Sequence, residues 1–496
     1  MSVKRILAAA LAACVLLTVF ILPAAAEEEP VTLRICNWEE YIDLGGWDEE
    51  ETIDLESGNI IGENSVVEDF EEWYYETFGT RVRVEYSTFG TNEDLYNMLT
   101  IGDVYDLVCP SEYMIMKLME EDMIQPLSEG FFDPEVETNY YIKGVSPYIR
   151  EIFETHDING VTWDKCAAGY MWGVTGIVYN PDEISEEEAG TFHLLDNTDY
   201  RRKITMKDNV RDAYFAAVGA LKSDLLTSEE FRSREDYATA LQDEMNVVTP
   251  EMVNAVQDYL QKIKDNLYSF ETDSGKADMI TGKVVANYQW SGDAVYTMDQ
   301  AEEDDYYLNF VATKESTNVY FDGWVMLKKG LAQDPRKQQA AEAFMNFVSR
   351  PDIVVRNMYY IGYTSTISGG DDGRVYEYLE WNYGAEEDEE GAVEYPVGYF
   401  FSGNAEDEDY VLTVPEEQLK RQLAAQYPSG DVINRASIMI YFNEQKSELI
   451  NRMWIRVRCF NILSIPLWVW IALVAVIIGA VIFHVRRKTL RERLYS

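Results

Sequence analysis

Short apolar runs alternate along this chain with stretches in which apolar residues recur every three or four positions. The first part is predicted to run strand, helix, strand, helix, strand over residues 33–37, 65–78, 81–86, 92–100 and 105–109. Gly79 and Gly102 follow the two helical stretches and Pro110 follows the third strand, as stop residues do. Strands that alternate with helices are typical of a largely parallel sheet covered by helices. The pattern therefore predicts an α/β fold.

The same pattern continues in the second half of the chain. Strands are predicted over 170–179, 284–290 and 324–327, and helices that begin with proline over 250–266 and 335–349. No internal repeat is present. From about 366 to 430 the sequence is acidic, aromatic and irregular, and it predicts no particular element.

The N-terminal apolar run predicts export. Lys4 and Arg5 precede it and Ala24 to Ala26 close it, which is the anatomy of a signal peptide over 1–26. Two alternatives stay open: lipidation at Cys14 after Leu11-Ala12-Ala13, and an uncleaved N-terminal anchor.

A second apolar run near the C-terminus predicts a membrane anchor. A stretch of about 19 apolar residues is long enough to cross a bilayer as one helix, and we place this helix over 464–484. The basic tail, 485–496, is then cytoplasmic and the bulk of the chain lies outside the cell. A buried core helix is the alternative. The expected localisation is the cell membrane, with a single pass and an extracytoplasmic body.

More than 400 residues lie between these two segments, which is roughly enough for two lobes with separate cores. The formal charge of −47, from 88 acidic and 41 basic residues, disfavours nucleic acid and anionic membrane surfaces as partners. The four cysteines after the signal region are too widely spaced for a zinc site or a disulfide framework, so free or singly paired thiols are expected at Cys36, Cys109, Cys166 and Cys459.

Four short clusters combine aromatic rings with carboxylates. They occupy 37–41, 110–113, 290–293 and 320–324, and three follow a predicted strand while the fourth opens one. Open α/β sheets bind ligands at the carboxyl ends of their strands. Carboxylates offset the cost of taking a cation out of water, and aromatic faces attract it. The clusters therefore indicate a site for an organic cation.

Several segments resemble the substrate-binding proteins of bacterial spermidine/putrescine ABC transporters. The matching segments are Asn37-Trp38 with Glu40-Tyr41, Tyr105 to Val108 with Pro110-Ser111 and Tyr113, Gly173 to Pro181, and Ile361-Gly362-Tyr363 after Arg350-Pro351-Asp352. The resemblance runs, with gaps, from about residue 33 to 456. It implies a two-lobed, periplasmic-binding-protein-like fold of type II, with a ligand cleft between lobes that crossing strands connect.

On this resemblance, lobe 1 would comprise 31–137 and 305–366, and lobe 2 would comprise 138–304 and 367–455. The protein would be a monomer without catalytic activity, metal or cofactor. It would capture putrescine, spermidine or both and deliver them to the ABC permease subunits in the membrane.

The resemblance also implies a set of ligand-binding residues. Carried over position by position, they are Trp38, Glu40, Tyr41, Ser111, Tyr113, Asn209, Asp212, Trp290, Tyr320, Asp322 and Tyr363. The three carboxylates would meet the amine groups of the ligand. The aromatic side chains would enclose its carbon chain.

One position departs from the family pattern. Asn209 stands where the family commonly has an acidic ligand residue, and an amide gives a cation less electrostatic compensation than a carboxylate. Fewer carboxylates favour a diamine, putrescine, over a triamine. A shift of one residue would instead bring Asp208 into the site.

Catalysis and the binding of a different ligand are alternative functions. A carboxylate pair can hydrolyse glycosides, but among 88 acidic residues such a pair is uninformative. The chain has three histidines and no nucleophile elbow, phosphate loop or HExxH motif, so we expect no enzyme. The same scaffold could bind ferric ion through tyrosine oxygens, or another organic amine, because a fold does not dictate its ligand.

Overall fold

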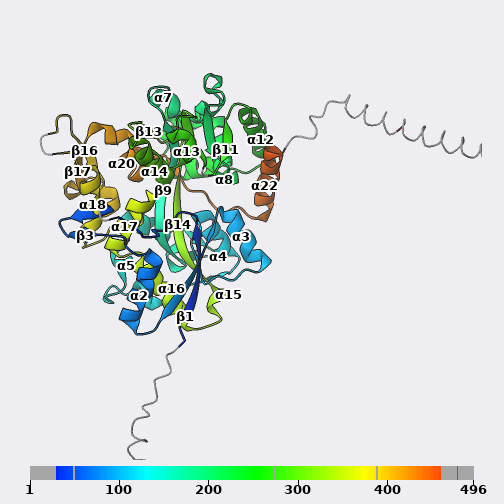
Figure 1. Ribbon diagram of the computed structural model, residues 1–496. Coiled ribbons are helices and arrows are strands. Elements are labelled where there is room, and N and C mark those ends of the chain that lie inside the picture. Colours follow the sequence, from blue (N-terminus) through cyan, green and yellow to red (C-terminus); the bar gives the residue numbers. More distant parts are fainter. Residues whose placement is uncertain (1–28, 49–50, 273, 387–388, 460–477, 479–496) are drawn as a thin grey trace, which may run out of the picture. The chain divides into compact units, whose positions relative to one another are not determined.

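The computed structural model describes residues 29–48, 51–272, 274–386, 389–459 and 478 (Figure 1). The predicted signal peptide, 1–26, and nearly all of the predicted membrane helix, 464–484, lie outside the described residues. Among the residues that are described, no helix is both long and apolar enough to cross a membrane.

The chain forms two compact units. Unit 1 comprises residues 1–174, 291–296 and 319–433, and unit 2 comprises 175–290, 297–318 and 434–496. Compared with the predicted lobes, 138–174, 291–296 and 367–433 belong to unit 1, and 305–318 belong to unit 2. Two of the divisions between the units fall inside long strands, β9 (Ala167–Tyr179) and β14 (Thr317–Leu327), rather than in loops.

Unit 1 is built on a mixed sheet. Its strands β1 (Val31–Trp38), β4 (Val82–Phe89) and β5 (Leu107–Val108) confirm the first three predicted strands. β1 pairs in parallel with β4 and with β5. β14 then pairs antiparallel with β5 and with β9, so the sheet is only partly parallel.

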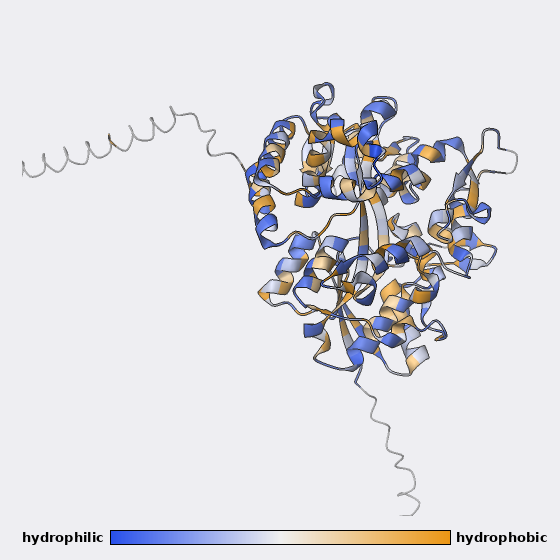
Figure 2. Cartoon of the chain, turned by 180° about the vertical axis from the view of Figure 1, so that it is seen from behind, coloured by the Kyte–Doolittle hydropathy of each residue, from blue (hydrophilic) through white to orange (hydrophobic). Residues whose placement is uncertain are grey.

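The first two predicted helices of unit 1 are confirmed. α2 (Val66–Phe78) begins after Ser65, which forms a capping box with Glu68, and α3 (Asn92–Ile101) begins after Thr91. Both helices end at a glycine in the left-handed conformation. The helices around the sheets carry alternating hydrophilic and hydrophobic residues (Figure 2), as amphipathic helices do.

Unit 1 contains further helices and several short strands before residue 366. The helices are α4 (Glu112–Glu120), α5 (Tyr140–Gly144), α6 (Pro147–Thr155), α15 (Lys328–Leu331), α16 (Arg336–Phe347) and α17 (Pro351–Ile361). The strands are β2 (Ile53–Leu55), β3 (Gly58–Ile60), β6 (Ile124–Gln125), β7 (Asp157–Ile158), β8 (Val161–Thr162) and β15 (Thr364–Ser365).

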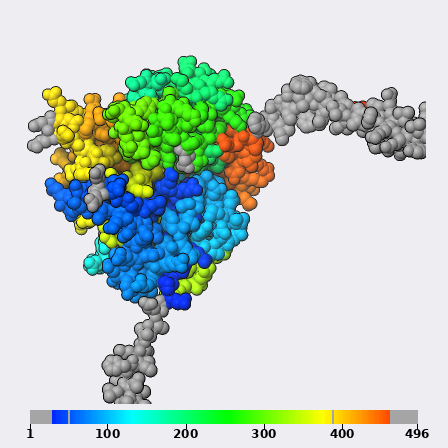
Figure 3. Space-filling model, viewed as in Figure 1, coloured from blue at the N-terminus to red at the C-terminus, as the bar shows by residue number. Residues whose placement is uncertain are grey.

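The irregular sequence after residue 366 folds as part of unit 1. It contains α18 (Arg374–Tyr383), α19 (Gly398–Phe401), α20 (Gln422–Gln426), α21 (Gly430–Asn434) and the hairpin β16 (Val393–Pro396) with β17 (Val411–Val414). Its aromatic side chains are largely core, and Phe400 stacks on Trp172 of β9 at 5.6 Å between ring centroids. Figure 3 shows its surface in yellow to orange.

Unit 2 has its own sheet. β10 (Ile204–Lys207) pairs in parallel with β11 (Ser269–Glu271) and β12 (Ala286–Trp290), and β12 pairs antiparallel with the second half of β9. The other elements are α7 (Glu186–Ala189), α8 (Val210–Leu221), α9 (Ser223–Leu226), α10 (Glu229–Arg232), α11 (Tyr237–Met245), α12 (Pro250–Lys264), α13 (Ser274–Ile280), β13 (Asn309–Val311), β18 (Ala436–Ser437) and α22 (Glu444–Arg458). α14 (Ser291–Glu302) begins in unit 1 and ends in unit 2.

The four described cysteines form no disulfide bond with one another. Cys36, Cys109 and Cys166 are buried, Cys459 is exposed, and all four are free. Burial raises the pKa of the Cys36 and Cys109 thiols, which keeps them protonated at neutral pH. They serve as small core residues.

Candidate functional site

A buried carboxylate in β14 is the centre of the candidate site in unit 1. Asp322 is 4% exposed, and its two oxygens accept hydrogen bonds from the hydroxyl groups of Tyr41, at 2.6 Å, and Ser111, at 2.7 Å. Burial raises the pKa of the Asp322 carboxyl to about 6, and the two hydroxyl groups oppose this shift. All three residues were predicted from the sequence.

The prediction of the strand around Asp322 was wrong at its start. The sequence placed a strand over 324–327, with Tyr320 and Asp322 ahead of it, but β14 already begins at Thr317. Tyr320 and Asp322 are therefore two residues apart within a strand and share one face of it. A register shift against β9 occurs directly after Asp322, and such bulges re-aim neighbouring side chains.

A network based on Asn92 surrounds Ser111 and Tyr113. The Asn92 amide donates to Ser111 Oγ at 3.1 Å and to the Tyr113 hydroxyl at 3.0 Å, and its Oδ1 accepts from the Ser111 backbone N–H. Because Ser111 Oγ accepts this bond, its own proton is free to point to Asp322. Asn92 is 1% exposed and no sequence signal marked it.

Tyr363 joins the same group of side chains. Its ring lies edge-on to the Tyr41 ring, with 4.7 Å between centroids, and its hydroxyl donates to Asp293 Oδ1 at 3.0 Å. Burial and then the charge of Asp293 raise the Tyr363 pKa well above its ordinary value. Asp293 belongs to the predicted cluster at 290–293 but was not among the predicted ligand residues.

Tyr320 is buried near the start of α14. Its hydroxyl lies 3.5 Å from Ser291 Oγ, and burial raises its pKa. Unit 1 thus brings five predicted residues into one connected group around the carboxylate of Asp322: Tyr41, Ser111, Tyr113, Tyr320 and Tyr363.

Trp38 is the last residue of β1, and Glu40 follows two residues later. Trp38 is half-buried and its ring centroid lies 4.7 Å from that of Phe89. Glu40 is exposed and has a φ of 52°, which is uncommon for a residue with a side chain. A turn in this conformation holds the Glu40 side chain at the surface, two residues after Trp38.

The three predicted residues of unit 2 surround the start of α8 and the end of β12. Asn209 caps α8, since its Oδ1 accepts from the backbone N–H groups of Arg211, at 2.8 Å, and Asp212, at 3.4 Å. Asp212 is buried at 4% exposure in the first turn of the same helix. The capping role accounts for a short side chain with an acceptor oxygen at position 209, which an aspartate would supply equally well.

Two neighbours of these residues in unit 2 are already engaged, and the first of them, Lys207, was not predicted. The Lys207 ammonium lies 4.4 Å from the centroid of the Trp290 ring, so a cation of the chain itself already contacts this aromatic face. Asp208, the alternative to Asn209, forms an ion pair with Arg458. Burial raises the Asp208 pKa, and Arg458 opposes this shift.

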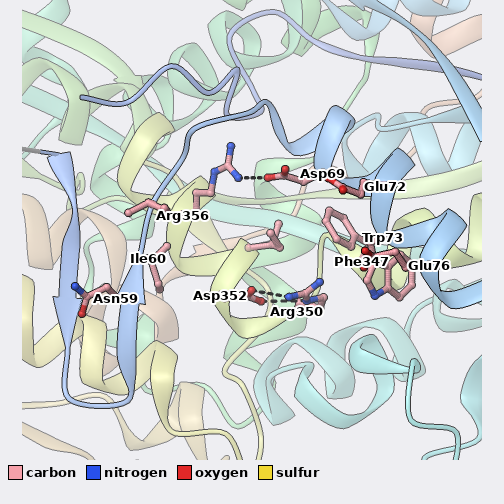
Figure 4. A pocket seen from close by; sticks show the side chains of 12 residues that line it. Asn59, Ile60, Asp69, Glu72, Trp73, Glu76, Phe347, Arg350, Asp352 and Arg356 are labelled. Atoms are coloured by element: carbon pink, nitrogen blue, oxygen red, sulfur yellow. Dashed lines mark hydrogen bonds and ion pairs between the residues drawn. The ribbon is translucent and has the colours of Figure 1, made fainter. Parts of the chain in front are cut away.

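A separate hollow of about 350 Å³ lies on unit 1 among α2, β3 and α17 (Figure 4). Its two arginines are already paired, Arg350 with Asp352 and Arg356 with Asp69 and the buried Asp43. It contains none of the predicted ligand residues. Within the described part of the chain, no group of three or more His, Cys, Asp and Glu side chains is placed to hold a metal ion.

Comparison with known proteins assigns the family. The family model of bacterial extracellular solute-binding proteins matches residues 65–376, more than half of the chain. The chain therefore belongs to the bacterial extracellular solute-binding proteins. This is a family of binding proteins and not of enzymes, which confirms the expectation of no catalytic activity.

The chain is also similar to individual proteins whose names describe polyamine binding. The chain is 25% identical over 358 residues to the putrescine-binding periplasmic protein PotF of Escherichia coli, covering 72% of this chain and 82% of the relative. It is 24% identical over 343 residues to the spermidine/putrescine-binding periplasmic protein of Salmonella typhimurium, and the match covers 68% of this chain and 79% of the relative.

Two solved structures share the fold. The spermidine/putrescine ABC transporter substrate-binding protein PotD of Streptococcus pneumoniae gives a TM-score of 0.53 at 21% identity, covering 86% of this chain and 98% of that chain. The TpPotD lipoprotein of Treponema pallidum gives a TM-score of 0.55 at 16% identity, and the match covers 86% of this chain and 99% of that chain. The predicted α/β fold of the substrate-binding proteins is confirmed.

Proposed function

We propose that this protein is the extracytoplasmic substrate-binding component of an ABC importer for linear polyamines, putrescine, spermidine or both. The observation that carries the proposal is the buried Asp322 carboxylate. Within the described residues its partners are two hydroxyl groups, and no lysine or arginine neutralises it. A buried carboxylate without a cation is costly. A protonated amine from the ligand would complete the pair.

The aromatic side chains around Asp322 support an amine with a carbon chain. Tyr41, Tyr320 and Tyr363 are buried beside this carboxylate. Their rings would contact methylene groups and add cation–π attraction to an ammonium group. The names of the relatives, which specify putrescine and spermidine, support the same class of ligand.

The remaining predicted residues take proposed roles. Glu40 would meet a second amine, while Trp38 and Tyr113 would line the chain of the ligand. Asp212, Asn209 and Trp290 of unit 2 would contribute when the two units, acting as lobes, close over the ligand. The protein would act as a monomer and pass its ligand to the permease.

We further propose that the chain is exported through 1–26 and anchored through 464–484. The apolar run and the basic residues after it support the anchor. A tether would keep the binding protein near the permease and raise its effective concentration there.

The anchor makes a direct prediction. In cells that express the full chain, the protein is expected in the membrane fraction, and a chain that ends at Cys459 is expected in the soluble fraction or the medium. Immunoblots of both fractions check this, with protease added to intact cells to show that the body is outside. Release of the full chain without detergent would contradict the anchor.

Calorimetric titration of the full chain in detergent tests the ligand. We expect saturable one-to-one binding of putrescine or spermidine, with spermine and ferric citrate as comparison ligands. The rank order of the amines shows whether Asn209 selects for a diamine. Absence of heat with every amine would refute the polyamine proposal, and tight binding of ferric citrate alone would favour the metal alternative.

The pH dependence of binding is a further prediction. With a pKa of about 6, Asp322 is mostly ionised at pH 7 and mostly protonated at pH 5. Only the ionised form offsets the ligand charge, so affinity should fall about tenfold from pH 7 to pH 5. Titrations at pH 5, 6, 7 and 8 check this. At pH 6 the measured heat should also depend on the ionisation enthalpy of the buffer, because binding releases a proton from Asp322. An affinity that does not change between pH 5 and pH 8 would contradict the role of Asp322 as the partner of the amine.

A further inference from the structure

The two residues on either side of Tyr363 both bind one residue far along the sequence, Gln426. Gln426 Nε2 donates to the backbone oxygen of Gly362 at 3.0 Å, and Thr364 Oγ1 donates to the backbone oxygen of Gln426 at 3.0 Å. Gln426 is 2% exposed. One residue of α20 therefore fixes the residues before and after Tyr363.

The Gln426 amide is itself held in one orientation. The hydroxyl of Tyr383, the last residue of α18, donates to Gln426 Oε1 at 2.9 Å. The backbone oxygen of Gly362 can only accept a hydrogen bond, so it identifies the nitrogen of the amide, and the Tyr383 hydroxyl then holds the oxygen end. Tyr383 is 5% exposed, so water does not replace the bond easily.

The Tyr363 ring has little freedom on its other sides. Gly362 ends α17 with a φ of 75°, which makes the turn into Tyr363. A Cβ atom at Gly292 would lie 2.2 Å from the Tyr363 ring, so the ring lies directly on that backbone. The ring also contacts Tyr41, whose hydroxyl group binds Asp322. A small displacement of Tyr363 would therefore reach the carboxylate of the site.

We propose that Gln426 and Tyr383 are positioning residues that fix the Tyr363 ring in the ligand site and thereby set ligand affinity. The inference rests on the proposed function for its effect on affinity. It assigns a role to the segment after residue 366, which carries both residues and contains none of the predicted ligand residues.

The test compares two tyrosines of this segment. Tyr383→Phe removes the hydroxyl that orients Gln426. Tyr395→Phe is the matched control: Tyr395 is also 5% exposed, and its hydroxyl donates to the backbone oxygen of Tyr427 at 2.6 Å, one residue beyond Gln426. Both variants lose one buried hydrogen bond, so similar losses of thermal stability are expected. Gln426→Leu removes the amide entirely.

Two measurements decide the outcome. A single 3-fluorotyrosine at position 363 of the full chain gives one fluorine resonance, expected to shift or broaden with Tyr383→Phe and Gln426→Leu but not with Tyr395→Phe. Putrescine affinity, by calorimetry, should fall about fivefold with Tyr383→Phe, the equivalent of one hydrogen bond, and stay within about twofold with Tyr395→Phe.

The outcomes separate this inference from the proposed function. If no amine binds the unchanged chain but the fluorine resonance responds as expected, the positioning of Tyr363 is supported and the polyamine assignment fails. If amines bind, and Tyr383→Phe and Gln426→Leu change neither the resonance nor the affinity, the inference is overturned. An equal response to Tyr395→Phe also overturns it, because the effect would then be general loosening.

Discussion

Asp322→Asn is expected to eliminate high-affinity amine binding and, at the same time, to make the ligand-free protein more stable. The substitution removes the charge that would pair with the ligand. It also removes a charge that folding buries without a cation among the described residues. Binding and stability should therefore change in opposite directions.

The size of the stability gain follows from the pKa. Burial raises the Asp322 pKa from 3.8 to about 6, so at neutral pH the ionised group costs the folded protein about 3 kcal/mol. The Asn side chain accepts only one of the two hydroxyl bonds, which forfeits about 1 kcal/mol. A net gain of about 2 kcal/mol in the free energy of unfolding is expected at pH 7.

Urea unfolding of the ligand-free protein between pH 4 and pH 7 measures this gain. The raised pKa means that the penalty is complete above about pH 6 and is relieved as the pH falls toward 3.8, so the advantage of the Asn variant should shrink over this range. Asp106→Asn is the control, because Asp106 is equally buried but paired with Lys337 at 2.8 Å. That control should lose stability; a loss with Asp322→Asn as well would contradict the prediction.

Arg356→Met should cause the largest loss of stability among these variants. The Arg356 guanidinium is buried in α17 and binds Asp43, Asp69 and the backbone oxygen of Asn64. Asp43 is 0% exposed, and removal of its partner leaves a buried charge. Breaking a buried pair in this way costs about 3–5 kcal/mol.

Arg350→Met is the matched control for this loss. Arg350 precedes the same helix and pairs with Asp352 at 2.7 Å, but both side chains are more than a quarter exposed. Such a pair contributes about 1 kcal/mol or less. Urea unfolding of both variants, followed by tryptophan fluorescence, compares them. Equal losses would show that Arg356 does not hold the acidic segment after Tyr41 in place.

The elements that were predicted well from the sequence are those whose start and stop residues lie next to the element itself. α2 lies between a capping box at Ser65 and a left-handed Gly79, and both are visible in the sequence. The start of β14 was missed because polar residues at Thr317, Asn318 and Asp322, followed by Gly323, interrupt its apolar pattern. They are nevertheless buried, since Thr317 donates to the backbone of Thr175 in the neighbouring strand. Burial between two long strands is a tertiary effect that periodicity does not report.

In the candidate site, too, some residues were predictable from the sequence and others depend on contacts that only the fold creates. Asp322, Ser111 and Tyr41 were predicted by resemblance, and the structure brings them within hydrogen-bonding distance. Asn92 and Gln426 could not be predicted, because each acts on residues that are close only in the fold. Asn209 did carry a local signal, since asparagine directly before a helix is a common cap. The resemblance implies a ligand residue at this position, whereas in the structure the Asn209 side chain caps α8.

The Lys207 ammonium above the Trp290 ring has a consequence for selectivity. For the proposed ligand, contact with this ring would be an exchange, in which one cation replaces another on the same aromatic face. The gain would then be only the difference between two similar attractions. An internal competitor of this kind discriminates against small, weakly held cations and favours a ligand whose second charge is held elsewhere. Trp290 would thereby contribute to the choice of ligand more than to the strength of binding.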